Sequence, residues 1–152
     1  MESQALNVLV MAHLIVLSMW GGVVATEEVI EIYPFRRKEL HAATIRFHYW
    51  IDLLVELPLV LAVVATGVSL VILTDPMTPL HFVKIGCGSA AVAVNIFCIA
   101  VVVRRGKKLE RHPDDQSLWR SSKTVLICFA AGLLCAACAA VLGFRFALDR
   151  LG

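Results

Sequence analysis

The sequence predicts an all-α integral membrane protein, a single domain built as a bundle of four helices. Residues 3–26, 57–74, 85–103 and 124–144 contain no Asp, Glu, Lys or Arg. The chain is 59% hydrophobic, well above the usage of soluble proteins. A bilayer core about 30 Å thick needs about 20 helical residues, so 152 residues accommodate four spans with short loops. A four-stranded barrel is excluded, because lipid would leave its backbone edges without hydrogen bonds.

The basic residues predict how the bundle sits in the membrane. Eleven of the fourteen Lys and Arg residues fall within residues 36–46 and 104–123, between the first and second and the third and fourth apolar blocks. The positive-inside rule places both segments in the cytoplasm and both termini outside, in a bacterial-type inner membrane. With a net charge of +2, the chain also lacks the basic stripe of a nucleic-acid-binding protein.

The first helix is expected over residues 6–33, and it ends before Pro34. It lacks the basic start and the cleavage site of a signal peptide, so we count it as a span. Gly21 and Gly22 leave room for a close neighbour, either another helix or a flat ligand. Steps of three and four residues place several of its polar and aromatic side chains on one stripe of the helix, namely His13, Trp20, Glu27 and Glu31.

The second helix is expected over residues 39–73, which is longer than a bilayer requires. Its first part carries a polar stripe at steps of three and four residues, comprising His41, His48, Asp52 and Glu56. Pro58 lies inside the span and is expected to kink or loosen it locally. Gly67 predicts a second point of close approach.

The third and fourth helices are expected over residues 80–103 and 122–145, with small-residue faces that favour close packing. These faces exceed what four helices need, which predicts a homo-oligomer or a place in a larger membrane complex. Asn95 is the mid-span amide of the third helix. All five cysteines lie in apolar spans, so we interpret Cys135-x-x-Cys138 as packing rather than as a redox or metal motif.

The spacing predicts a cluster of carboxylates and imidazole at the cytoplasmic ends of the first two helices. At about 1.5 Å per residue, Glu27 and Asp52 lie about 18 and 20 Å below the midplane, and Glu31 and His48 both about 24 Å. Glu56 lies one turn nearer the centre. Such ligands suit iron, zinc, copper or manganese. The alternative is a set of salt bridges and headgroup contacts with the nearby Arg and Lys residues.

His13 lies only about 3 Å of helical rise from the centre of the first span. An ionisable residue there is costly and suggests function, and neutral imidazole is a usual haem ligand. Trp20, two turns away, can flank a porphyrin or simply pack. The alternative for His13 is a hydrogen bond to a Ser or a backbone carbonyl. Lys84, one turn into the third helix, is expected to snorkel to the interface.

Three segments within residues 8–103 carry a family resemblance: MAHLIVLSMWGG, ELPLVLAVVATG and PLHFVKIG. They resemble the small four-helix membrane proteins that include the bacterial membrane-bound protoporphyrinogen oxidase and the membrane part of copper-resistance protein D. The resemblance implies that His13 binds haem b and that Lys84 belongs to the catalytic pocket. This chain differs in the spacing of His81 and Lys84, and it carries Asn95 where the family has a His.

Three hypotheses for function remain open on the sequence alone. The first is a b-type haem protein with a redox or electron-transfer role toward a quinol or porphyrin, which includes a haem-dependent oxidoreductase, with His13 as axial ligand and His48 or Lys84 in a second role. The second is a non-haem metal protein that uses Glu27, Glu31, His48, Asp52 and Glu56. The third is an accessory or assembly subunit of a larger membrane complex.

Overall fold

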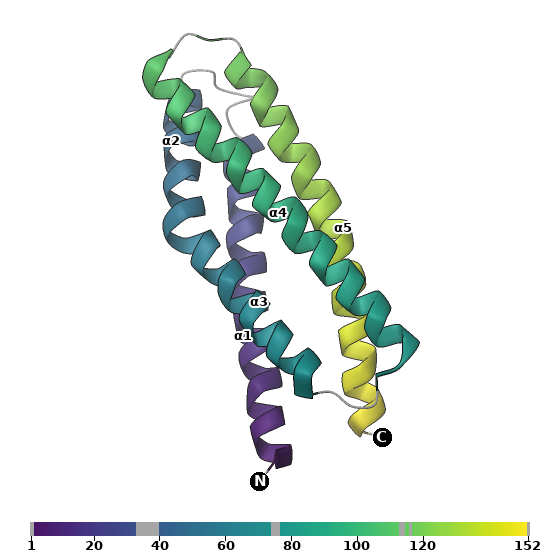
Figure 1. Ribbon diagram of the computed structural model, residues 1–152. Helices are drawn as coiled ribbons and strands as arrows, with labels where there is room; N and C mark the ends of the chain where they lie inside the picture. Colours follow the sequence, from purple (N-terminus) through teal and green to yellow (C-terminus); the bar gives the residue numbers. More distant parts are fainter. Residues whose placement is uncertain (1, 33–39, 74–76, 113–114, 116, 152) are drawn as a thin grey trace.

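A computed structural model describes residues 2–32, 40–73, 77–112, 115 and 117–151. This part of the chain is all-α, and Figure 1 shows its helices running along one another. They are α1 (Glu2–Ile32), α2 (His41–Ile51), the π-helical turn η3 (Asp52–Glu56), α3 (Leu57–Leu73), α4 (Pro79–Arg111) and α5 (Ser117–Leu151). The turn expected at residues 33–38 and the first part, residues 75–76, of the outer turn expected at residues 75–79 lie outside the described residues.

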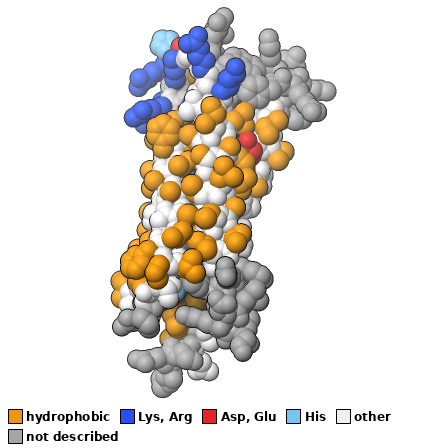
Figure 2. Space-filling view, turned by 90° about the vertical axis from the view of Figure 1, so that its right-hand side faces the viewer, with side chains coloured by type: hydrophobic (Ala, Val, Ile, Leu, Met, Phe, Trp, Pro, Cys, Tyr) orange, Lys and Arg blue, Asp and Glu red, His pale blue; other side chains and the backbone are white. Residues whose placement is uncertain are grey.

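Four segments of the described chain are long and apolar enough to cross a membrane, which confirms the predicted multi-pass bundle. They are Gln4–Ile32, His41–Leu73, Pro79–Arg111 and Arg120–Gly143. Figure 2 shows a broad hydrophobic zone along the molecule, with Lys and Arg side chains gathered at one end. Exposed side chains at that end include Arg104, Lys107 and Arg111 of α4 and Arg120 and Lys123 of α5. Both chain termini lie at the opposite end (Figure 1).

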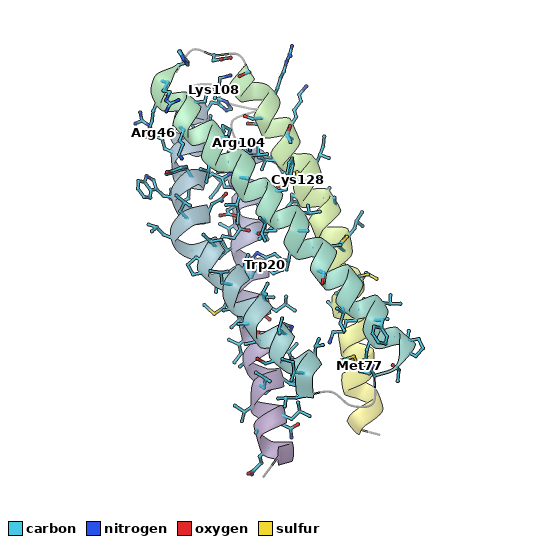
Figure 3. All side chains as sticks on the ribbon, viewed as in Figure 1. Trp20, Arg46, Met77, Arg104, Lys108 and Cys128 are labelled. Carbon is cyan, nitrogen blue, oxygen red and sulfur yellow. The ribbon has the colours of Figure 1, made fainter. Side chains whose placement is uncertain are left out.

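The helices pack as two unequal pairs that meet near the basic end. α4 and α5 lie side by side over much of their length, α1 packs on α3, and α2 packs on α4 (Figure 1). The membrane core centres on Trp20, Val60, Val63 and Ala91. Trp20 lies about halfway along the bundle, with Arg104 and Met77 toward opposite ends (Figure 3).

Pro58 loosens the second span as predicted, and the structure shows how. Proline has no N–H, and its ring would collide with the carbonyl four residues earlier in a regular α-helix. The chain widens into the π-helical turn η3 just before it, where the Leu57 N–H donates to the Asp52 carbonyl. The direction of the span changes between α2 and α3 (Figure 1). Pro58 therefore sets the course of the helix that carries Asp52 and Glu56.

The helices α4 and α5 extend further at the basic end than the apolar runs indicate. We expected them to end near residue 103 and to begin near residue 122, whereas α4 continues to Arg111 and α5 begins at Ser117. A second buried cluster explains the extension, because Leu109 and Leu118 pack against Ile45 of α2. Gly106 permits this approach, since a Cβ atom there would lie 2.6 Å from Tyr49 Cδ2.

Candidate metal centre

The polar stripes of α1 and α2 meet inside the bundle. Glu27 and Glu31 come from α1, His48 from α2 and Asp52 from η3, and each of these residues is at most 4% exposed. The level predicted from helical rise is confirmed for Glu31 and His48, whose side chains are hydrogen-bonded. Buried carboxylates in proteins are normally paired with a cation or with hydrogen-bond donors.

His48 lies between two carboxylate environments. Its Nδ1 atom is 2.9 Å from Glu31 Oε2 and 3.2 Å from Arg105 Nη2, so it donates to the carboxylate in one tautomer and accepts from the guanidinium in the other. In the tautomer that donates to Glu31, the lone pair of Nε2 faces the opposite side, where Asp52 Oδ1 lies 3.3 Å away and Glu27 Oε2 lies 3.9 Å away. This is the orientation of a histidine whose second ring nitrogen binds a metal.

Arg105 fixes Glu31 in place. Its guanidinium donates to both Glu31 oxygens, with Nη2 2.8 Å from Oε2, and it also donates to Ser122 Oγ at 3.1 Å. Sequence reasoning assigned Arg105 to a cytoplasmic loop and gave Ser122 no role. Arg105 is only 2% exposed, because the helix continues past residue 103 and this part of it also has a buried face. A helix extended beyond the apolar run would have indicated this position.

Glu27, His48 and Asp52 form the group that can hold a metal ion. One possible ligand atom from each residue lies within 4.8 Å of the other two. Neither oxygen of Asp52, nor Oε1 of Glu27, has a hydrogen-bond donor within the described residues. Arg105 already neutralises Glu31, so the remaining buried carboxyl groups need protons or a cation. An ion here would receive two carboxylate oxygens and one imidazole nitrogen.

Glu31 and Glu56, which we also expected as ligands, lie outside this group of three. Glu31 accepts from Arg105 and His48. Glu56 Oε1 accepts from Asn95 Nδ2 at 2.5 Å and from Trp20 Nε1 at 3.3 Å. Trp20 is thus a buried donor to a carboxylate, and the flanking of a porphyrin stays a prediction.

His13 and Lys84 lie elsewhere in the bundle. His13 is about 21 Å of helical rise from Glu27, so the two predicted centres are separate. The Thr66 hydroxyl donates to the Ala62 carbonyl, which leaves Thr66 Oγ1 to accept from His13 Nδ1 at 2.8 Å. The imidazole lies against Gly67 of α3, where a Cβ atom would make an ordinary van der Waals contact of 3.4 Å with His13 Cε1. The Lys84 side chain lies against Gly143 of α5.

A cavity of about 300 Å³ adjoins the group of three. Glu27, His48, Glu56 and Asn95 line it together with Cys98 and Cys128. Helices α1, α4 and α5 supply most of its wall, which is largely apolar and includes Leu17, Gly21, Val94, Phe129, Gly132 and Ala136. Figure 3 places Cys128 on α5 between Lys108 near one end and Met77 near the other. The candidate metal centre therefore borders a larger, partly open cavity.

Comparison of this chain with protein-family models, with curated proteins and with solved structures finds no match. The arrangement of its own side chains therefore carries the functional conclusion.

Proposed function

We propose that this chain is an integral membrane metalloprotein that binds a divalent transition-metal ion through Glu27, His48 and Asp52. One observation carries the proposal: Nδ1 of His48 lies against Glu31, which can accept its proton, while Nε2 on the other side of the ring faces two carboxylates that lack donors. Metal-binding histidines in proteins almost always donate their other ring N–H to a carboxylate, carbonyl or water. Here that partner is Glu31, which Arg105 orients in turn.

The ligand set favours iron, zinc or manganese over magnesium or calcium, because imidazole binds the transition metals better. Copper was also expected from the sequence; the absence of a thiolate among the three ligands disfavours Cu(I), whereas imidazole and carboxylate also suit Cu(II). Three protein ligands leave at least one coordination position open, as in catalytic metal sites. An ion in such a position can polarise an oxygen of a bound partner or exchange electrons with it.

Elemental analysis of the purified protein tests the proposal. The wild-type chain, purified in mild detergent and supplied with iron, zinc and manganese, should retain about one ion per chain. His48→Ala and Asp52→Ala should lose it, and Glu31→Gln should weaken metal affinity about 10- to 100-fold through the second ring nitrogen. His13→Ala is the matched control, a histidine of the same bundle outside the cluster, and should keep the ion. A folded wild-type protein that takes up none of these metals would remove the proposal.

A haem b centre is the second candidate, and the hydrogen bond between His13 Nδ1 and Thr66 Oγ1 is the observation that favours it. Because Nδ1 donates to Thr66, the lone pair of Nε2 is the one available to iron. Protein expressed with ample haem should then show a Soret band that His13→Ala abolishes and His48→Ala leaves intact. An absent Soret band under these conditions excludes haem and leaves the Glu27–His48–Asp52 proposal standing.

The membrane, the assembly and the partner of the chain also remain predictions. They are a bacterial-type inner membrane with the basic end in the cytoplasm, assembly as a homo-oligomer or within a larger complex, and a quinol or porphyrin as partner. An accessory role would be favoured if a second protein co-purified with a metal-free and haem-free chain. Native mass spectrometry from mild detergent distinguishes these assemblies by their mass.

A further inference from the structure

We infer that the cavity beside the metal centre binds the hydroxylated ring of a membrane-soluble hydroquinone. The inference rests on the proposed function, because the metal centre supplies the polar end of the same cavity. It adds the chemical class of the partner, and it rests on the wall, the size and the unpaired acceptors of the cavity.

The wall of the cavity suits a ligand that arrives from the bilayer. Its lining residues come mainly from α1, α4 and α5, and they are predominantly apolar. Two of them, Gly21 and the 55% exposed Leu133, also belong to the outer surface of α1 and α5. That surface lies within segments long and apolar enough to cross the membrane, so it faces lipid. A molecule dissolved in the bilayer can therefore reach the cavity without crossing water.

The inner end of the cavity calls for a hydrogen-bond donor. Glu27 and Asn95 both line the cavity, and a rotation of their side chains would turn Glu27 Oε1 and Asn95 Oδ1, which are buried and lack a donor among the described residues, toward a ligand. A buried acceptor left unsatisfied costs about 1–3 kcal/mol, so each position favours a ligand that brings an O–H group. A hydroquinone carries two such donors, whereas an alkyl chain or a fully alkylated ether carries none.

The size and the aromatic lining favour a single ring. A volume of about 300 Å³ is at the lower end of small-molecule sites, and at about 30 Å³ per water-sized group it holds roughly ten heavy atoms. Trp20 and Phe129 both line the cavity and can contact a ring by stacking or edge-to-face packing. One substituted ring fits this space better than the four-ring macrocycle of a porphyrin.

Gly21 is the wall residue that makes the inference testable. The sequence predicted a helix or a flat ligand beside Gly21 and Gly22. Among the described residues, and apart from the neighbouring residues and backbone of α1 itself, no atom lies within 4 Å of a Cβ atom built on either glycine, so no other helix fills the place. Gly21 borders the cavity, whereas Gly22 is not among its lining residues. A leucine at position 21 would therefore enter the cavity, and a leucine at position 22 would not.

The experiment measures binding of a decyl-substituted benzohydroquinone to the purified protein by calorimetry, under anaerobic conditions. We expect saturable binding to wild-type and Gly22→Leu, and at least a tenfold weaker affinity for Gly21→Leu. The dimethyl ether of the same probe lacks the O–H donors and should bind at least tenfold more weakly to wild-type. Equal affinity of the ether would mean that the site selects only an apolar chain, and equal affinity of Gly21→Leu would mean that the cavity is not the site; either result overturns the inference.

Metal content separates a failure of this inference from a failure of the proposed function. Gly21→Leu and Gly22→Leu should both keep the metal of wild-type, which also shows that they fold. Metal retained in wild-type without hydroquinone binding overturns only the inference. Hydroquinone binding that follows the glycine pattern in a chain unable to hold metal supports the cavity as the ring site and overturns the metal proposal alone.

Discussion

Arg105 of α4 holds both carboxylate oxygens of Glu31 of α1, although the two residues are 74 positions apart in the sequence. Glu31 in turn accepts from His48 of α2, so three helices meet through one buried carboxylate. This chain of contacts links the packing of the bundle to the orientation of the candidate metal ligand.

Removing Arg105 should destabilise the bundle strongly. Arg105→Ala leaves Glu31 buried without its cation, and breaking a buried ion pair from one side costs about 3–5 kcal/mol. Arg104→Ala is the matched control, because Arg104 is an exposed neighbour on the same helix. Unfolding in mixed detergent micelles should show a much lower midpoint for the first variant only. Equal midpoints for the two variants would show that the pair contributes little.

Gly106 should tolerate no side chain. A Cβ atom at this position would lie 2.6 Å from Tyr49 Cδ2, so Gly106→Ala forces α2 and α4 apart, at a cost of about 1–3 kcal/mol. Gly106→Ala should therefore destabilise the Tyr49→Ala variant less than it destabilises wild-type. Gly88→Ala, a glycine of the same helix with open space around it, should be nearly neutral. Thermal unfolding of wild-type and the four variants gives the comparison, and additive losses would contradict the contact.

Cys87 should react with Cys138 on mild oxidation. Their sulfur atoms are 3.4 Å apart across the α4–α5 contact, and the described cysteines are all free thiols. Oxidation with a copper–phenanthroline reagent should link the two in a disulfide, detected as one crosslinked peptide pair by mass spectrometry. Cys138→Ser should abolish this product, whereas Cys135→Ser should preserve it. A product that joins Cys135 to Cys138 instead would contradict the packing of these helices.

Acid should loosen the start of α5. Hydrogen bonds from Lys108 and from the Ser117 amide hold the pKa of Asp115 well below its ordinary value. A carboxyl group whose folded-state pKa is lowered stabilises the fold above its unfolded pKa, and this contribution is lost as the pH falls through the folded value. Hydrogen exchange of the first turn of α5, corrected for intrinsic rates, should therefore rise toward strong acid in wild-type. Asp115→Asn should lack this pH dependence, and an identical rise in the variant would refute it.

Several features of the fold and of the site follow from the sequence because they depend on local rules. Charge-free blocks of about 20 residues predict the spans. A fixed rise per residue predicts that Glu31 reaches His48, and the missing N–H of Pro58 predicts the loosened second span. Each of these predictions is confirmed by the described structure.

The unpredicted features depend on how whole helices lie against one another. We took Arg105 for a loop residue because the apolar run ends at residue 103, and apolarity marks the membrane boundary rather than the end of a helix. The contacts of Leu109 and Leu118 with Ile45 that extend α4 and α5 join distant segments. The cavity likewise reflects the angle between α1 and the α4–α5 pair, which no local spacing encodes. Whether Glu27, His48 and Asp52 bind metal stays a prediction.

The order of synthesis gives the Arg105–Glu31 contact a consequence for biogenesis. Glu31 enters the membrane environment with the first hairpin, whereas Arg105 is translated 74 residues later. At about 5–20 residues per second, the carboxylate waits roughly 4–15 s for its guanidinium. During that interval the nascent first hairpin carries acidic groups that the finished protein buries. Completion of the bundle therefore depends on the delivery of α4, and insertion factors that shield polar nascent helices should be needed most at this stage.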